Sequence, residues 1–172
     1  MSKLILLRGN SGSGKTTTAI LLQQALGHNI MRISQDVIRR DMLRVKDGQD
    51  TLALPLLKEL LRYGSRTCPV VILEGILRRE WYAPLFDLAG ELFGSQIFAY
   101  YYDLPFEETL RRHQTKNNRD DFGEEAMRGW WVEKDYLNRI AEKRIPASLS
   151  QQETVHMILQ DLSLTDKEDN NG

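Results

Sequence analysis

The sequence predicts a single α/β domain in which helices flank a parallel sheet. Short apolar runs alternate with longer amphipathic segments along the chain, which is the pattern of folds whose helices cross over between parallel strands. A glycine-rich turn, Gly9–Thr16, separates the first apolar run from the first amphipathic segment. A chain of 172 residues is long enough for one domain with a core of its own.

The first strand and the first helix enclose a phosphate-binding motif. Leu4–Leu7 is an apolar run that predicts a buried strand, and residues 17–26 carry a helical pattern that ends before Gly27, a residue suited to a C-cap. Between them, the sequence GNSGSGKT matches G-x-x-x-x-G-K-[ST]. Strand, glycine-rich turn and helix in this order are the context in which the motif binds nucleotide phosphates.

Each residue type in this motif, the P-loop, has a role in phosphate binding. Glycines let backbone N–H groups approach phosphate oxygens, and the positive N-terminus of the following helix attracts anions. Lys15 brings a charge to the β- and γ-phosphates, and the Thr16 hydroxyl is a ligand for Mg²⁺. A dinucleotide fingerprint is excluded, because Thr17 stands where its third glycine would be. The predicted nucleotide-binding residues of this stretch are Gly9, Asn10, Ser11, Gly12, Ser13, Gly14, Lys15, Thr16 and Thr17.

The next elements continue the alternation of strand and helix. Residues 30–33 predict a short strand, and Ser34 opens a helix to Leu43 with polar residues suited to an N-cap. Thr51–Tyr63 has leucines at helical spacing and predicts an amphipathic helix. Pro69–Leu73 is apolar on both faces, as a central parallel strand requires.

The second half of the chain follows the same rule. Trp81–Phe93 predicts a helix, Ile97–Tyr102 an aromatic-rich strand, and Pro105 the first turn of a helix to about Thr115. Lys116–Asp121 is polar and predicts a loop. The remaining predictions are a helix at 122–140 with Trp130 and Trp131 in the core, a strand at 143–147, a helix at 150–162 and a disordered tail at 163–172.

The composition argues against several classes of protein. The net charge of −1 gives no overall attraction to nucleic acid or to an anionic membrane surface. Cys68 is the only cysteine, so no intramolecular disulfide can form. The sequence shows no signal peptide, no spacing of zinc ligands and no apolar run of membrane-spanning length. We therefore expect a cytoplasmic protein that does not bind a membrane.

Residues that follow the strands are the candidate site residues, because ligands bind at the carboxyl ends of parallel strands. Asp36 follows the second strand, and Arg39 and Arg40 lie at helical spacing from it. Asp36 can act as a general base on an attacking hydroxyl, or it can cap the helix that begins there, or it can do both. Next to a phosphate site, we favour the catalytic role.

Two more groups of residues follow later strands. Glu74 ends the third strand and suits Mg²⁺ coordination through water or a hydrogen bond to substrate, with a surface or helix-start role as the alternative. Arg78 and Arg79 follow it as either substrate clamps or a solvated face. The basic stretch 111–119 predicts a mobile lid, since an arginine that closes over the site stabilises the transferring phosphoryl group. The alternative is an ordinary basic loop.

Together, these motifs resemble the group of small P-loop kinases that contains the zeta toxins, polynucleotide kinases and chloramphenicol phosphotransferases. The resemblance rests on the P-loop, on Ser34-Gln35-Asp36-x-x-Arg39, on Leu73-Glu74-Gly75-x-Leu77-Arg78 and on the basic lid, and it extends from about Lys3 to Leu162. It implies a three-layer P-loop NTPase fold with a five-stranded parallel sheet of the adenylate-kinase type. The sequence departs from the group in having Glu74 where an aspartate usually ends the third strand.

The resemblance also implies roles for individual residues. Asp36 would be the general base, Arg39 would orient substrate or phosphate, and Glu74 would place substrate or metal-bound water. An arginine of the lid, about 112–121, would contact the nucleotide. The predicted assignments are Lys15, Asp36 and Arg119 as catalytic residues, Arg112 as a further nucleotide ligand, Arg39, Arg40, Glu74 and Arg78 as substrate-binding residues and Thr16 as the metal ligand.

The predicted activity is transfer of the γ-phosphate of ATP, with Mg²⁺, to a hydroxyl of a small molecule such as a nucleoside or a nucleotide sugar. GTP is not excluded as donor, because the P-loop contacts only phosphates. One alternative is a polynucleotide 5′-hydroxyl kinase that holds the terminal nucleotide on a local patch made of Arg39, Arg40, Arg44, Arg78 and Arg79. The other is a nucleotide-dependent switch or partner-binding module, although nothing in the sequence indicates a protein partner, including the inhibitor that a toxin would require.

Overall fold

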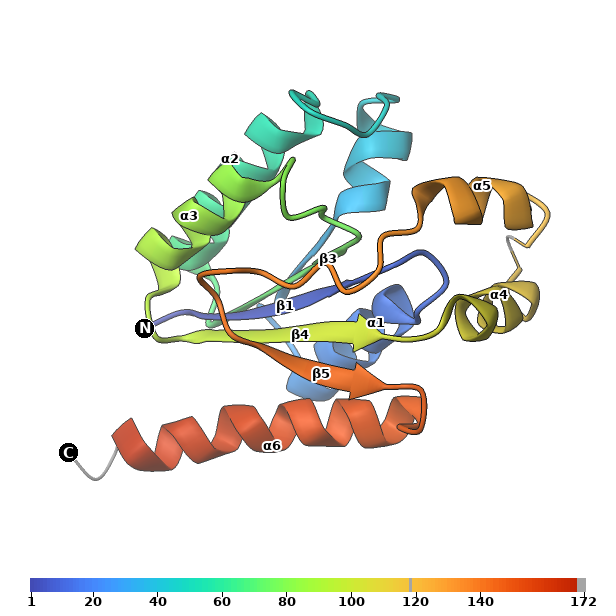
Figure 1. Cartoon of the computed structure of the whole chain (residues 1–172). Helices are drawn as coiled ribbons and strands as arrows, with labels where there is room; N and C mark the ends of the chain where they lie inside the picture. The colour runs from blue at the N-terminus through green and yellow to red at the C-terminus, as the bar shows by residue number, and fades with distance from the viewer. Residues whose placement is uncertain (118, 170–172) are drawn as a thin grey trace.

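The computed structural model describes residues 1–117 and 119–169. Within these residues, five parallel strands form one sheet in the order β2-β3-β1-β4-β5 (Figure 1). The predicted α/β class and the five-stranded parallel sheet are therefore confirmed. The strands are β1 (Lys3–Gly9), β2 (Met31–Ser34), β3 (Val70–Gly75), β4 (Ile97–Asp103) and β5 (Glu142–Pro146).

The helices form layers on both faces of the sheet and a third group beyond its carboxyl edge. In Figure 1, α1 and α6 lie on one face, α2 and α3 on the other, and α4 and α5 beyond the ends of the strands. The short η1 is a π-helix that directly follows β2. The bounds are α1 (Lys15–Leu26), η1 (Val37–Met42), α2 (Ala53–Thr67), α3 (Ala83–Phe93), α4 (Phe106–Gln114), α5 (Glu124–Trp130) and α6 (Gln151–Asp169).

The alternation of side chains in β1 divides the core into two halves. Leu4 and Leu6 pack with residues of α2 and α3, whereas Ile5 and Leu7 pack with residues of α1 and α6. All four leucine and isoleucine side chains are fully buried, as expected for a central strand covered on both faces.

The strand register brings the predicted site residues to one edge of the sheet. Glu74 in β3 is paired with Leu7 in β1 and with Ser34 in β2. Gln35 and Asp36 directly follow Ser34 in the chain. The P-loop leaves the same end of β1. The carboxyl ends of three strands therefore place Glu74, Asp36 and the P-loop beside one another.

The helix predicted at 122–140 is the main error in the predicted secondary structure. Helix α5 ends at Trp130, and residues 131–141, here called the strap, run in an irregular path back to β5. Several backbone groups of the strap bond to side chains of the P-loop and of the sheet. Asn10 binds both the N–H and the carbonyl of Val132, and the N–H of Asp135 donates to the hydroxyl of Tyr101. These bonds replace the helical bonds that the sequence pattern suggested.

A fully buried arginine explains why the strap takes this path. Arg8, at the end of β1, forms ion pairs with Asp135 at 2.8 Å and with Glu142 at 2.9 Å. Its guanidinium also donates to the carbonyls of Leu77 and Asp135. Burial raises the pKa of Glu142, and Arg8 opposes that effect. Because a buried guanidinium needs charged and polar partners, the strap must pass over Arg8.

Replacing Arg8 by methionine is expected to lower the free energy of unfolding by about 3–5 kcal/mol, because it leaves Asp135 and Glu142 without their buried partner. Urea denaturation measures the change. The matched control is Arg144→Met, which breaks the pair with Asp103 but removes a side chain that is 64% exposed. That variant is expected to lose less than about 1 kcal/mol. Equal losses in the two variants would show that Arg8 does not anchor the strap.

Two further differences from the predictions concern helix ends and the tail. Helix α6 continues to Asp169 instead of ending at Leu162, and residues 170–172 lie outside the described residues. The disorder expected for residues 163–172 stays a prediction. The helix predicted at 34–43 is confirmed as a helical segment, but its core is the π-helix η1. None of the helices in the described part of the chain has the length and apolar character needed to cross a lipid bilayer.

Candidate functional site

The P-loop connects β1 to α1 and is held in place by close packing. Gly12 has a φ of +81°, a conformation that side chains rarely adopt. A Cβ on this residue would lie 2.5 Å from the carbonyl oxygen of Thr109 in α4. Gly14, which precedes α1, has a left-handed conformation as well. The sequence motif therefore needs glycine both for the turn and for the close approach of α4.

Lys15 is buried at the base of the P-loop. Its Nζ donates to the carbonyl oxygen of Asn10 at 2.8 Å, so the ammonium group lies against the loop that would hold phosphates. Burial lowers the pKa of Lys15 to about 8, although the nearby carboxylates of Glu74 and Asp36 act in the opposite direction. The low pKa indicates that this ammonium lacks the negative charge that would stabilise it fully.

We expect ATP binding to take up a proton above pH 8. The pKa of Lys15 is about 8 in the free protein, and the negative charge of a bound triphosphate would raise it. Lys15 is then charged in the complex at a pH where it is neutral in the free protein. Affinity should therefore be greatest below pH 8 and fall as the pH rises. Titration calorimetry at about pH 9, in two buffers of different ionisation enthalpy, measures the proton uptake. Binding that is independent of pH and buffer would contradict this expectation.

The oxygens at the start of α1 fit a magnesium ion. Thr16 Oγ1 donates to Glu74 Oε1 at 3.1 Å, so a hydroxyl and a buried carboxylate meet beside the phosphate site. Hard oxygen ligands of this kind are those that Mg²⁺ prefers. In the described residues, no cluster of three or more His, Cys, Asp or Glu is placed to hold a metal alone.

A cavity of about 100 Å³ lies over the P-loop and is lined in part by residues of the predicted lid. His113 and Lys116 of the predicted lid line this cavity together with Phe122, which follows the lid. Asp36, Arg40 and Glu74 line it from the sheet side. Burial lowers the pKa of Lys116, which Glu74 and Asp36 partly offset. We call this space the P-loop cavity.

The two arginines that were predicted to contact the nucleotide lie in different places relative to the P-loop. Arg112 in α4 donates from Nη1 to the carbonyl of Ser13 at 2.8 Å and is also paired with Glu108, so it touches the P-loop itself. Arg119 is exposed and is not among the residues that line the P-loop cavity. Its role in the transition state stays a prediction, as does that of Thr17, which is exposed on the first turn of α1. Asn118, in the same lid, lies outside the described residues.

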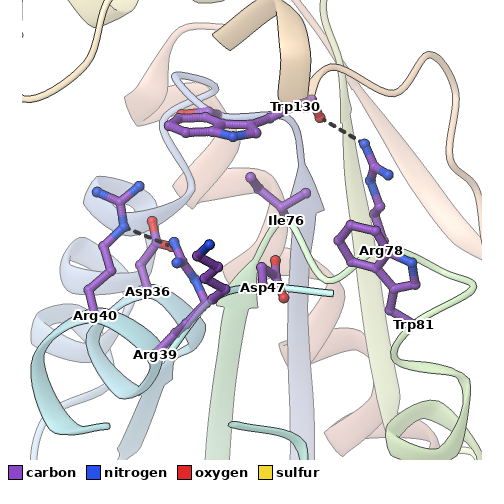
Figure 2. Close-up of a pocket in the computed structure, with 10 residues that line it drawn as sticks. Asp36, Arg39, Arg40, Asp47, Ile76, Arg78, Trp81 and Trp130 are labelled. Carbon is purple, nitrogen blue, oxygen red and sulfur yellow. Dashed lines mark hydrogen bonds and ion pairs between the residues drawn. The ribbon is translucent and has the colours of Figure 1, made fainter. Parts of the chain in front are cut away.

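A second cavity, of about 340 Å³, adjoins the P-loop cavity, and we call it the side cavity. The two cavities share four lining residues, Ser11, Asp36, Arg40 and Ile76. Figure 2 shows Asp36, Arg39 and Arg40 on one side of Ile76, Arg78 and Trp81 on the other side, and Trp130 above. The full lining is Ser11, Asp36, Arg39, Arg40, Lys46, Asp47, Ile76, Arg78, Trp81 and Trp130.

Asp36 does not act as a helix cap. It precedes η1 with a helical backbone conformation and makes no capping hydrogen bond with its side chain. Its carboxylate instead accepts from Arg39 Nη2 at 3.2 Å and lies 3.8 Å from Arg40 Nε (Figure 2). The side chain remains 55% exposed at the boundary between the two cavities. The capping role that the sequence left open is therefore not the role seen here.

Trp130 was expected in the core, and this expectation is wrong. Its side chain is 39% exposed and lines the side cavity. It lies edge-on to Phe122, and the guanidinium of Arg40 lies within 6 Å of both rings, at 5.9 Å from Trp130 and 5.4 Å from Phe122. Arg40 thus connects η1 to Phe122 and to the end of α5. Trp131, in contrast, is half-buried and lies edge-on to Phe106.

Several residues of the site were not predicted, because they come from segments far apart in the chain. Asp47 accepts from Tyr82 Oη at 2.6 Å and from Gln35 Nε2 at 3.0 Å, so three separate segments fix one wall of the side cavity. Trp81 was placed in a helix without a function. Of the basic patch proposed for a nucleic-acid end, Arg79 instead binds Tyr136 and Asn138 of the strap. The sequence feature that could have indicated these site residues was the position of Trp81, a few residues after a strand.

The sequence matches the model of a protein family. The model of a family described as AAA domain matches residues 4–131, which include the P-loop, η1 and the lid. Among the curated proteins, none matches the sequence significantly.

Solved structures share the fold over nearly the whole chain. A gluconokinase from Sinorhizobium meliloti 1021 has a TM-score of 0.69 at 16% identity and covers 96% of this chain and 94% of its own. The Mycobacterium tuberculosis APS kinase CysC in complex with AMPPNP and APS has a TM-score of 0.65 at 19% identity, with coverages of 94% and 98%. The tunicamycin resistance protein of Deinococcus radiodurans has a TM-score of 0.59 at 18% identity, with coverages of 94% and 96%. At these identities the likeness shows the fold.

Proposed function

The chain belongs to the AAA domain family, and from this premise we propose that it is a kinase that transfers the γ-phosphate of ATP to a hydroxyl of a small molecule. The observation that carries the proposal is the position of Asp36, which lines both the P-loop cavity and the side cavity. A carboxylate between a phosphate site and a second, larger cavity is placed to receive a proton from an acceptor hydroxyl.

In this proposal, the P-loop cavity binds the phosphate donor and the side cavity binds the acceptor. The P-loop amides and Lys15 hold the β- and γ-phosphates, and the acceptor occupies the side cavity with its hydroxyl at Asp36. Asp36 takes the hydroxyl proton as the oxygen attacks the γ-phosphorus and the bond to the β-phosphate oxygen breaks. Lys15 and Lys116 line the P-loop cavity and Arg112 contacts the P-loop at the Ser13 carbonyl, and these three cations stabilise the charge on the transferring group. The lining residues that the two cavities share align donor and acceptor.

Magnesium fits this arrangement through the Thr16 hydroxyl and, through water, Glu74. When bound, it neutralises charge on the β- and γ-phosphates. The lid at about 112–121, a cytoplasmic location and ATP as the donor, with GTP not excluded, belong to the same proposal. The kinases among the solved structures support phosphoryl transfer as the reaction type.

The proposal is tested by incubating the protein with γ-labelled ATP and Mg²⁺ and a panel of acceptors. The panel contains nucleosides, nucleotide sugars, aminoglycoside- and chloramphenicol-type antibiotics, and an oligonucleotide with a 5′-hydroxyl. We expect label in a small-molecule acceptor. Label in the oligonucleotide alone would support the polynucleotide kinase, because Arg39, Arg40 and Arg78 of the proposed patch do line one cavity. Label released only as inorganic phosphate would contradict transfer and favour a nucleotide-dependent switch.

A further inference from the structure

The side cavity has more positive than negative charge in its walls. Four cationic side chains line it, Arg39, Arg40, Lys46 and Arg78, against the carboxylates of Asp36 and Asp47. Asp36 is engaged by two of these arginines. Asp47 accepts hydrogen bonds from Tyr82 and Gln35, neither of which is cationic, and no lining cation is paired with it. Lys46 and Arg78 therefore have no carboxylate partner among the described residues.

Arg78 is held in a fixed position with most of its donors free. Its guanidinium lies 4.4 Å from the centre of the Trp81 ring, an arrangement that orients the plane of the group. Its one hydrogen bond within the described residues is a long one, from Nη2 to the carbonyl of Trp130 at 3.4 Å. A guanidinium has five N–H donors in a fork that matches a carboxylate or a phosphate. The cavity thus presents an oriented anion-binding group that the protein itself does not use.

The two walls of the side cavity differ in what they offer a ligand. Figure 2 shows Asp36 with Arg39 and Arg40 on one side of Ile76, and Arg78 with Trp81 on the other. On the Asp36 side, the cavity joins the P-loop cavity through Ser11 and Ile76. On the Arg78 side, the free cation lies away from the transferring phosphate. The Trp130 ring lies above Asp36 and Arg39 on the Asp36 side of Ile76 (Figure 2).

We infer that the phosphate acceptor is an acid, a hydroxyl compound that carries a carboxylate or phosphate group, and that Arg78 binds this group opposite Asp36. The inference rests on the proposed function and narrows its substrate class. The acceptor hydroxyl lies at Asp36, the anionic group at Arg78 with Lys46 near it, and the carbon skeleton against Ile76 and Trp130. A neutral acceptor of the same shape would leave Arg78 without a partner, and it would therefore be rejected.

Matched pairs of probes that differ in the acidic group test the inference. D-Gluconate and D-glucose form the carboxylate pair, and adenosine 5′-monophosphate and adenosine form the phosphate pair. Binding is measured by tryptophan fluorescence, because two of the three tryptophans of the chain, Trp81 and Trp130, line the side cavity. Transfer is measured separately with γ-labelled ATP and Mg²⁺. We expect quenching and label incorporation with at least one acid and much weaker responses with its neutral partner.

The variant Arg78→Gln removes the anion-binding group and keeps a polar side chain. We expect its affinity for the acid to fall about 10- to 100-fold, which is the worth of a charge-assisted hydrogen-bonded contact. Affinity for ATP should not change. The matched control is Arg62→Gln on α2, which removes an exposed arginine paired only with Glu59. It is expected to bind acid and ATP as the wild type does.

The outcomes separate the inference from the proposed function. If the neutral partner binds or accepts phosphate as well as the acid does, or if neither acid quenches the fluorescence, the inference is wrong. The same conclusion follows if Arg78→Gln binds the acid unchanged. If an acid binds in an Arg78-dependent manner but no label is transferred, the anion site stands and the proposed kinase activity is wrong.

Discussion

Replacing Lys15 by alanine is expected to abolish phosphoryl transfer, with kcat/KM reduced by at least about 10³-fold. Lys15 is the ammonium group buried at the base of the P-loop, where its Nζ lies 2.8 Å from the Asn10 carbonyl. Negative charge develops on the γ-phosphoryl oxygens in the transition state. Within the P-loop, Lys15 is the cation that can stabilise this charge. Arg112 touches the loop from outside, at the Ser13 carbonyl, and cannot take the same position.

The measurement for Lys15→Ala is label transfer from γ-labelled ATP, with circular dichroism and thermal unfolding to show that the fold is intact. Burial disfavours the charged form of Lys15, so its removal is expected to leave stability unchanged or increased. The control is Lys143→Ala on β5, which removes a half-exposed lysine paired with Asp161. A folded Lys15→Ala protein that transfers phosphate within tenfold of the wild-type rate would contradict the role given to this residue.

The elements around the P-loop were predictable because local sequence determines them. The glycines of the loop, the apolar run of β1 and the helical pattern of α1 agree with one another, and no distant contact overrides them. The position of Glu74 at the sheet edge followed from its place at the end of an apolar run, since the ends of parallel strands meet.

The strap and the side cavity were not predictable because long-range contacts determine them. Residues 131–141 have a sequence compatible with a helix, but the buried Arg8 and the amide of Asn10 bind their backbone instead. The sequence indicated this only through Arg8, a charged residue at the end of the apolar strand β1. The residues that pair with Arg8 could not be identified from the sequence. In the same way, Asp47, Trp81 and Trp130 meet in one cavity only after η1, α3 and α5 are in place.

The role of Asp36 lies between these cases, and one substitution tests it. Sequence analysis left a helix cap and a general base as alternatives, and the structure removes the cap. Two roles remain for the carboxylate, which are to accept the proton of the acceptor hydroxyl and to hold Arg39 and Arg40 in place. These roles predict different kinetic effects, because a base acts in the transition state whereas an orienting contact acts on substrate binding.

The variant Asp36→Asn is expected to lower kcat by roughly 10²-fold or more, the usual contribution of a general base, while the Kd for ATP changes little. An asparagine oxygen can still accept the hydrogen bond from Arg39, so the geometry of η1 is preserved while the proton acceptor is lost. Initial rates at saturating ATP, over a range of acceptor concentrations, give kcat and KM separately. The matched control is Asp41→Asn, a change to an exposed aspartate of the same π-helix that lines neither cavity.

The pattern of losses decides between the two roles of Asp36. If kcat falls and the KM for the acceptor is retained, Asp36 acts as the base, since arginine placement and ground-state binding are then intact. If the KM rises and kcat is retained, Asp36 serves to orient Arg39 and Arg40, and the proton leaves by another route. A wild-type rate in Asp36→Asn would remove Asp36 from the reaction altogether. The side cavity would then be a binding site whose chemistry depends on the P-loop alone.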